Sequence, residues 1–306
     1  MTVELVEVRA RISTDVVGRD RELDLALAAV SAGRDLLLEG PPGTSKTTLL
    51  SAITAQWHIP LVFVEGNADL TPARLVGHHN PSRVLREDYS VDNFVDGPLL
   101  DAMRSGGFLY IEELNRAPED SLNTLLTAMA ERRITIPRVG TVHALPTFRV
   151  VASMNPFDNI GTSRLSTSIL DRLCRIAIGY QDAEAERRIV ALRTAERTAN
   201  LDPQLAERMR HDAVALTRRT RESEDIRQGS SVRGAIDLML VASELVTMRA
   251  ISGDDDRYAE TFYDALTLAL SGRIVLEQTL DTTPEAVLRV LWEDHFLLDP
   301  ARAAPG

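Results

Sequence analysis

The sequence predicts an α/β domain followed by a helical domain, and two patterns lead to this fold class. Over residues 36–178, five short apolar runs of strand length alternate with stretches of helical periodicity. From Asp182 onward, apolar residues recur at helical spacing. We therefore predict one domain over residues 1–180 and a second over residues 181–306, which ends in a disordered tail.

A glycine-containing loop joins the first predicted strand to a helix. The strand is Leu36–Glu39, and the loop is Gly40-Pro41-Pro42-Gly43-Thr44-Ser45-Lys46-Thr47-Thr48. Glycine lets backbone N–H groups approach phosphates at the start of a helix. The loop follows the pattern G-x-x-x-x-G-K-[ST], except that Ser45 occupies the second glycine position. We expect Gly43 to supply the missing flexibility.

The composition singles out Lys46. The chain contains 34 lysines and arginines, and Lys46 is its only lysine. A compact ammonium suits the space between phosphates. We predict that Lys46 reaches the outer phosphates of a nucleotide and that the Thr47 hydroxyl binds magnesium. The alternative is an ordinary Gly/Pro turn before a helix.

Length, composition and charge narrow the class of protein. The chain has 306 residues, 44% of them apolar, which is enough for a substantial core. The single cysteine, Cys174, lies in an apolar run, so we expect a buried thiol and a reducing compartment. We expect no membrane segment and a cytoplasmic location. The net charge of −11 disfavours a nucleic-acid partner.

The segment before the loop is predicted to be an amphipathic helix. Its apolar stripe is Leu23, Ala26, Leu27 and Val30, and Gly33 ends it. It follows the turn Val16-Val17-Gly18, which could place Val17 and Gly18 beside a nucleotide base. The alternative for this turn is plain core packing.

After a second strand at residues 61–65, a polar stretch from Asn67 to Pro98 is predicted to be a surface insertion. A short helix should begin near Thr71, which precedes a proline. The adjacent His78 and His79 suggest a metal site. However, adjacent side chains point apart, and no other His or Cys clusters with them, so metal binding is the weaker hypothesis.

Two acids follow the third predicted strand. This strand, Phe108–Ile111, is followed by Glu112 and Glu113. Ligands of α/β sheets gather at the carboxyl ends of strands, so these acids should lie near the glycine loop. They divide naturally into a magnesium ligand and a group that activates water. The alternative is a solvated strand end.

Polar residues also follow the later elements. A helix from Pro118 leads to a β-hairpin at about residues 133–145. The fourth strand, Phe148–Ala152, delivers Asn155 to the same edge of the sheet, although an Asn before Pro is commonly a turn residue. A fifth strand is predicted at residues 174–178.

Taken in order, these motifs resemble those of AAA+ ATPases and, more narrowly, the MoxR family, which is related to the magnesium-chelatase ATPase subunits. The matching segments are GPPGTSKT at 40–47, EELNRAPED at 112–120, the hairpin from ERRITI to Ala144, ASMNP at 152–156, ILDRL at 169–173, GYQDAEAER at 179–187 and SSVRGA at 230–235. The resemblance covers roughly residues 10–275.

The resemblance implies a five-stranded parallel P-loop sheet with a helical lid, assembled as a homo-oligomeric ring, usually a hexamer, with ATP or ADP and Mg²⁺ between subunits. The resemblance assigns magnesium binding to Thr47 and Glu112, and it makes Glu113 the catalytic acid. Asn155 would be the sensor-one residue that orients water, Arg172 the arginine finger offered to the neighbouring subunit, and Arg233 the sensor-two arginine of the lid. The residues that would bind the nucleotide are Gly40, Pro42, Gly43, Thr44, Ser45, Lys46, Thr47 and Thr48. The insertion at about 80–97 and the hairpin would contact substrate.

The acid pair departs from the family pattern, and the choice of arginine finger leaves an alternative. Glu112 stands where aspartate is usual, and its extra methylene could displace the carboxylate and slow hydrolysis. Arg172 could instead pair with Asp171, and Arg164 is the rival finger. If Glu113→Gln hydrolysed ATP as fast as the parent, the assignment of Glu113 would be wrong.

The resemblance implies an ATPase that remodels, matures or activates a partner protein, chaperone-like, with a von Willebrand factor A domain partner and often a metalloenzyme client. One alternative is a nucleotide-gated scaffold with little turnover, which Glu112 suggests. Another is a nucleic-acid motor, which only Arg132, Arg133 and Arg138 of the hairpin support. The client, the subunit number and the direction of force stay open.

Overall fold

The computed structural model describes residues 2–87, 89, 91–156, 165–279 and 281–298. The chain forms two compact units, residues 1–179 and residues 180–306. Each unit has a hydrophobic core, and each is described here by itself.

A five-stranded sheet forms the centre of the first unit. Its strands are β1 (Asp35–Glu39), β2 (Leu61–Glu65), β5 (Phe108–Glu112), β8 (Arg149–Met154) and β9 (Leu173–Ala177). They are arranged in the order β2-β5-β8-β1-β9, and all neighbouring pairs are parallel. Helices cover both faces, which explains why the strands are almost continuously apolar. The predicted α/β fold with five parallel strands is confirmed.

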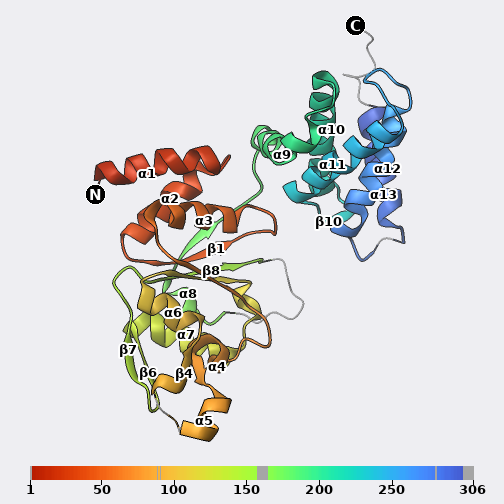
Figure 1. The fold of residues 1–306 in the computed structure, drawn as a ribbon. Helices are drawn as coiled ribbons and strands as arrows, with labels where there is room; N and C mark the ends of the chain where they lie inside the picture. The colour runs from red at the N-terminus through yellow and green to blue at the C-terminus, as the bar shows by residue number, and fades with distance from the viewer. Residues whose placement is uncertain (1, 88, 90, 157–164, 280, 299–306) are drawn as a thin grey trace. The chain divides into compact units, whose positions relative to one another are not determined.

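Three helices cover one face of the sheet (Figure 1). They are α1 (Thr2–Asp15), α2 (Asp20–Ser31) and α3 (Lys46–Trp57). The stripe predicted for α2, namely Leu23, Ala26, Leu27 and Val30, is buried. The sequence analysis did not predict α1, whose Val8 and Ile12 belong to the same core.

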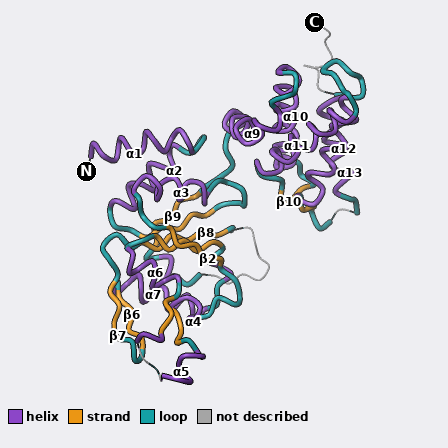
Figure 2. Tube along the Cα trace, viewed as in Figure 1, coloured by secondary structure: helices purple, strands orange, loops and turns teal. Residues whose placement is uncertain are grey.

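The opposite face is covered by α4 (Pro72–Val76), α6 (Pro98–Ser105), α7 (Glu119–Glu131) and α8 (Thr167–Leu170), as Figure 2 shows for α6 and α7. Thr71 caps α4 by accepting a hydrogen bond from the backbone N–H of Arg74, so the helix begins where the Thr-Pro pair predicts. The turn η2 (Leu114–Arg116) follows β5.

Two short antiparallel pairs extend from this side. One is the predicted hairpin, β6 (Arg133–Ile136) with β7 (Gly140–His143). The other lies in the polar insertion and pairs β3 (Gly77–His79) with β4 (Phe94–Asp96). Between these strands lie α5 (Pro81–Glu87) and η1 (Val91–Asn93).

An ion pair between a partly exposed arginine and a buried aspartate joins the base of the hairpin to the first strand. Arg132 ends α7 with a left-handed backbone (φ 50°). Its guanidinium donates to both carboxylate oxygens of Asp35, at 2.7 and 3.3 Å. Asp35 also accepts the backbone N–H of Val150 at 2.8 Å. Burial raises the pKa of Asp35, while these hydrogen bonds and the Arg132 charge lower it.

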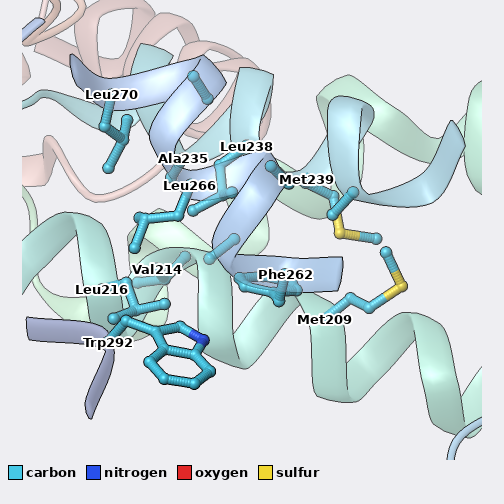
Figure 3. Packing of buried hydrophobic residues seen from close by; sticks show 14 of the residues in the cluster. Met209, Val214, Leu216, Ala235, Leu238, Met239, Phe262, Leu266, Leu270 and Trp292 are labelled. Atoms are coloured by element: carbon cyan, nitrogen blue, oxygen red, sulfur yellow. The ribbon is translucent and has the colours of Figure 1, made fainter. Parts of the chain in front are cut away.

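The second unit is built mainly from helices. They are α9 (Ala183–Thr198), α10 (Pro203–Glu222), α11 (Val232–Met248), α12 (Tyr258–Leu270), η3 (Ser271–Arg273) and α13 (Pro284–Phe296). Figure 3 shows Met209, Leu238, Phe262 and Trp292 from four of these helices packed in one core. A short antiparallel pair, β10 (Ile226–Gln228) with β11 (Val275–Leu276), was not predicted.

One prediction about the first unit is wrong. Cys174 is exposed, not buried. It lies on β9, an edge strand of the sheet, which is paired on one side only. Leu173 and Ile176 of this strand are buried, and Cys174 and Arg175 between them are exposed.

Candidate functional site

The loop between β1 and α3 has the geometry of a phosphate cradle. The backbone N–H of Gly40 donates to the Met154 carbonyl at 3.1 Å. A Cβ at Gly40 would lie 2.0 Å from the carbonyl oxygen of Ile178, so only glycine fits there. Gly43 has a φ of 73°. The loop therefore lies tightly against the ends of β8 and β9 and leads directly into the N-terminus of α3.

Ser45 adopts the conformation that the motif assigns to glycine. Its φ is 65° and its ψ is 24°, in the left-handed region. Gly43 also has a positive φ, so its flexibility does not remove the requirement at position 45. A residue with a Cβ in this region costs roughly 1–2 kcal/mol. The substitution keeps the shape of the loop at the expense of backbone strain.

Lys46 points back into the loop. Its ammonium donates to the carbonyl oxygens of Gly40 at 2.9 Å and Pro41 at 2.7 Å, and it lies 3.4 Å from the Thr44 hydroxyl. The Thr44 hydroxyl donates to the Pro41 carbonyl at 2.9 Å. The side chain of Lys46 is largely buried, and its charge lies at the start of α3, where the helix dipole also favours an anion.

The two acids lie at the end of β5. Glu112 is the last residue of the strand, and Glu113 follows it with a left-handed backbone (φ 54°). A Cβ at Gly66 would lie 2.4 Å from the Glu113 carbonyl oxygen, so a glycine at the end of β2 makes room for this turn. The Glu113 carboxylate forms a salt bridge with Arg116 Nε at 3.0 Å. Sequence reasoning gave Arg116 no role.

A buried tyrosine connects the loop helix to the strands. The hydroxyl of Tyr110, on β5, donates to Ser153 Oγ at 3.1 Å and lies 3.4 Å from Thr47 Oγ1. Burial raises the pKa of Tyr110, hydrogen bonds with Ser153 and Thr47 lower it, and the nearby Glu112 carboxylate raises it. Sequence reasoning missed this tyrosine, although side chains alternate along a strand and residues 110 and 112 share a face.

Asn155 directly follows β8, which lies between β5 and β1 in the sheet. The loop, the two acids and Asn155 therefore occupy the carboxyl ends of three neighbouring strands, which is where ligands bind in α/β sheets. The structure thus brings together the residues proposed for phosphates, metal and water.

The other predicted residues lie away from these strand ends or in the second unit. Arg172 is exposed between α8 and β9, donates to the Ser168 carbonyl at 2.8 Å and, in the described part of the chain, forms no salt bridge with Asp171. Arg233 is exposed in the first turn of α11, in the second unit. Arg164 lies outside the described residues.

The turn at Val17 and Gly18 lies next to Gly179, the last residue of the first unit. Val17 is buried, and Gly18 has a φ of 66°. The next residue, Arg19, donates to the Gly179 carbonyl at 2.6 Å and pairs with Glu22. The contact to Gly179 ties the turn to the chain just beyond β9.

The histidine pair takes part in aromatic packing. His79 lies edge-on against the rings of Tyr89 and Phe94, with centroids 5.2 and 5.1 Å away. In the described residues, no group of three or more His, Cys, Asp or Glu side chains could hold a metal ion. A magnesium ion bound with a nucleotide needs less from the protein, because phosphates and water supply most of its ligands.

Most of the first unit is similar to a known protein family. Residues 35–173 match the family model described as "AAA domain (dynein-related subfamily)". This part of the chain is therefore similar to AAA domains. The cradle, the lysine and the strand-end acids fit a nucleotide, which is consistent with that similarity.

Proteins similar to this chain include an uncharacterized protein of Staphylococcus epidermidis, strain RP62A, 27% identical over 251 residues, which are 79% of this chain and 93% of the relative. Another is the gas vesicle ATPase GvpN of Ancylobacter aquaticus, 28% identical over 258 residues, which are 78% of this chain and 69% of GvpN.

Solved structures share the fold of this chain. The RuvB Holliday junction branch migration motor of Thermotoga maritima matches with a TM-score of 0.51 at 17% identity, over 82% of this chain and 70% of that one. NtrX of Brucella abortus, solved in complex with ADP, matches with a TM-score of 0.52 at 19% identity, over 80% of this chain and 54% of that one. None of the helices that the structure describes is long and apolar enough to span a membrane.

Proposed function

We propose that this protein is a MoxR-type AAA+ ATPase that binds ATP with magnesium at residues 40–48 and hydrolyses it in a cytoplasmic homo-oligomeric ring of six subunits. The observation that carries the proposal is the alignment of three strand ends. β1 leads into the phosphate cradle, β8 leads to Asn155, and β5 ends in Glu112 and Glu113. The match to an AAA domain supports the same conclusion.

Each residue has one task in this proposal. The loop amides and Lys46 bind the phosphates, and Thr47 and Glu112 hold the magnesium, which supplies positive charge against the phosphate oxygens. Glu113 and Asn155 orient the attacking water. Arg172 acts on the nucleotide of a neighbouring subunit, and Arg233 senses it from the second unit. Catalysis then depends on positioning and electrostatics.

We further propose that the ring uses hydrolysis to remodel or activate a partner protein that carries a von Willebrand factor A domain, with a metalloenzyme as the final client. The support for this step is the resemblance of the combined motifs to the MoxR family. The hairpin β6–β7 and the insertion with β3, α5 and β4 are the elements proposed to contact the partner.

A second candidate function is a nucleotide-gated scaffold with little turnover. The observation that favours it is the salt bridge between Glu113 and Arg116, at 3.0 Å, because a carboxylate engaged by a guanidinium has to leave it before it can contact the attacking water. The longer side chain of Glu112, in place of aspartate, also favours a scaffold with little turnover. Both functions require nucleotide binding, and only the first requires rapid release of phosphate.

The test measures nucleotide binding and phosphate release on the same full-length preparations. Lys46→Ala should lose nucleotide binding by at least about tenfold, because it removes the ammonium from the cradle. Glu113→Gln should bind nucleotide as the parent does and release phosphate about 10²-fold more slowly. Glu119→Gln, an exposed acid at the start of α7, is the matched control and should change neither quantity.

Two outcomes would decide against the proposal. If the parent protein binds nucleotide but releases phosphate no faster than ATP does in buffer alone, the scaffold is the better description. If Glu113→Gln hydrolyses ATP as fast as Glu119→Gln, Glu113 has no catalytic role.

A further inference from the structure

Tyr110 has a place in the fold that the assigned roles leave unexplained. Its side chain is completely buried, at the middle of β5 and on the face covered by α3. The other β5 residues on that face are Phe108 and Glu112. A phenol in an apolar core must satisfy its hydroxyl, which a phenylalanine would not have to do.

The hydroxyl finds partners on two other elements. It donates to Ser153 Oγ of β8 at 3.1 Å and lies 3.4 Å from Thr47 Oγ1 in the first turn of α3. Ser153 is itself buried, with 1% of its surface exposed, so the packing around Ser153 holds this contact in place. A single oxygen atom therefore links α3, β5 and β8 at the point where the proposed site is built.

We propose that Tyr110 is a positioning residue for magnesium: its hydroxyl, anchored by Ser153, holds the hydroxyl of Thr47 and sets the reach of the Glu112 carboxylate. The inference rests on the proposed function, because Thr47 and Glu112 are the residues proposed to bind the metal. Tyr110 touches neither the metal nor the nucleotide and acts through its two neighbours.

Tyr110 and Glu112 lie two residues apart on one face of β5, and this placement allows the hydroxyl a second role. A glutamate side chain has one more rotatable bond than an aspartate, so it reaches further and is harder to hold in one rotamer. A phenol donates one hydrogen bond and accepts others, and the Tyr110 hydroxyl can pass its donated bond from Ser153 to the carboxylate two residues along the strand. The longer acid is then held where a shorter one would need no support.

The experiment titrates magnesium into full-length protein with a fluorescent ADP, and it measures ADP affinity in EDTA as a separate quantity. Tyr110→Phe removes only the hydroxyl. We expect its affinity for ADP in EDTA to stay within about twofold of the parent, and the magnesium concentration at half-saturation to rise about tenfold. A purely structural role would shift both quantities together or neither.

The matched control is Tyr258→Phe. Tyr258 is also a buried phenol, 1% exposed, and it donates to Asp212 Oδ2 at 2.9 Å in the second unit. Its loss should lower the melting temperature without moving the magnesium midpoint. If Tyr110→Phe does not fold, Ser153→Ala replaces it, with an expected rise of about threefold in the magnesium midpoint.

A double-variant cycle tests the path through Glu112. In a Glu112→Asp background the carboxylate is shorter, so removing the Tyr110 hydroxyl should change the magnesium midpoint by less than about twofold. A tenfold rise in that background as well would overturn the role assigned to Glu112.

The outcomes separate this inference from the function on which it rests. If the parent binds ADP and magnesium, and Tyr110→Phe gives the same magnesium curve, the inference is overturned and the proposed function stands. If Tyr110→Phe weakens ADP binding in EDTA by the same factor as in magnesium, the hydroxyl supports the loop and not the metal, and the inference is again overturned. If the parent binds no ADP with or without magnesium, the proposed function itself is wrong.

Discussion

Ser45 shows how a single side chain can be at odds with the backbone that it must adopt. The residue before Lys46 has a left-handed backbone, which a Cβ disfavours, yet the loop carbonyls of Gly40 and Pro41 still accept hydrogen bonds from the lysine ammonium. The loop and the neighbouring strand ends therefore hold Ser45 in place.

Replacing Ser45 with glycine should make the first unit more stable. Relief of the strained backbone outweighs the extra freedom that glycine gains in the unfolded chain, so we expect a gain of about 0.5–1 kcal/mol. Thermal unfolding should show a rise in melting temperature of roughly 1–4 °C.

Ser45→Ala provides the control for that prediction, because alanine keeps the Cβ and removes only the hydroxyl. It should not raise the melting temperature. A Ser45→Gly protein that melts below the parent would show that the left-handed backbone carries no strain worth relieving.

At the scale of residues, the sequence predicts those parts of the site that lie within a few residues of each other in the chain. The loop, Lys46 and the two strand-end acids follow from a local pattern, and the structure places them along one edge of the sheet. The contacts of Tyr110 with Thr47 and Ser153 join residues 63 and 43 positions apart, and no local pattern encodes such contacts. Arg116 was missed because a salt bridge three residues away is only one of several that an arginine can make.

At the scale of elements, the junction of α7 and the β6–β7 hairpin depends on one arginine. Arg132 turns the chain out of α7 and pairs with Asp35, which is 3% exposed and also caps the Val150 amide. Removing a partner from a buried carboxylate is costly, because the remaining charge has little access to water.

We expect Arg132→Ala to lower the free energy of unfolding by about 2–3 kcal/mol, less than for a fully buried pair because Arg132 is partly exposed. Arg133→Ala is the control: the neighbouring arginine pairs with Glu131 at the surface, and its loss should cost less than about 0.5 kcal/mol. Urea unfolding compares the two, and equal stabilities would contradict the importance of the Asp35 contact.

The elements that escaped prediction are those with weak local signals. The strands β3, β4, β10 and β11 have two or three residues each, too few to show alternation, and each forms only because a distant partner pairs with it. Charged residues interrupt the apolar pattern of helix α1. Its Val8 and Ile12 are buried because they pack in the core that α2 and α3 share. The long helices and the apolar strands carry stronger periodicity.

At the scale of the whole molecule, the proposed ring predicts that two defective proteins can repair each other. Glu113→Gln lacks its own catalytic acid, and Arg172→Ala lacks the finger proposed for its neighbour, so each should be nearly inactive alone. In an equal mixture, an Arg172→Ala subunit that receives Arg172 from a Glu113→Gln neighbour has a complete site. This arrangement should occur at about a quarter of interfaces in a ring of head-to-tail contacts.

Phosphate release from mixed subunits, measured after exchange, tests this expectation. The control mixes Glu113→Gln with a double variant carrying both changes, in which no complete site can form. Recovery with the single variants and none with the double variant supports Arg172 as the finger. Without recovery in either mixture, Arg164→Ala takes the place of Arg172→Ala in the same experiment.

The tight fit of Gly40 beneath Ile178 has a mechanical consequence. Ile178 donates its N–H to Glu39, and one residue later the chain leaves the first unit through Gly179, whose carbonyl receives the Arg19 guanidinium. The cradle for phosphates and the exit of the polypeptide thus share a single layer of hydrogen bonds. A side chain at position 40 would therefore displace Ile178 and, with it, the backbone that leads to Gly179.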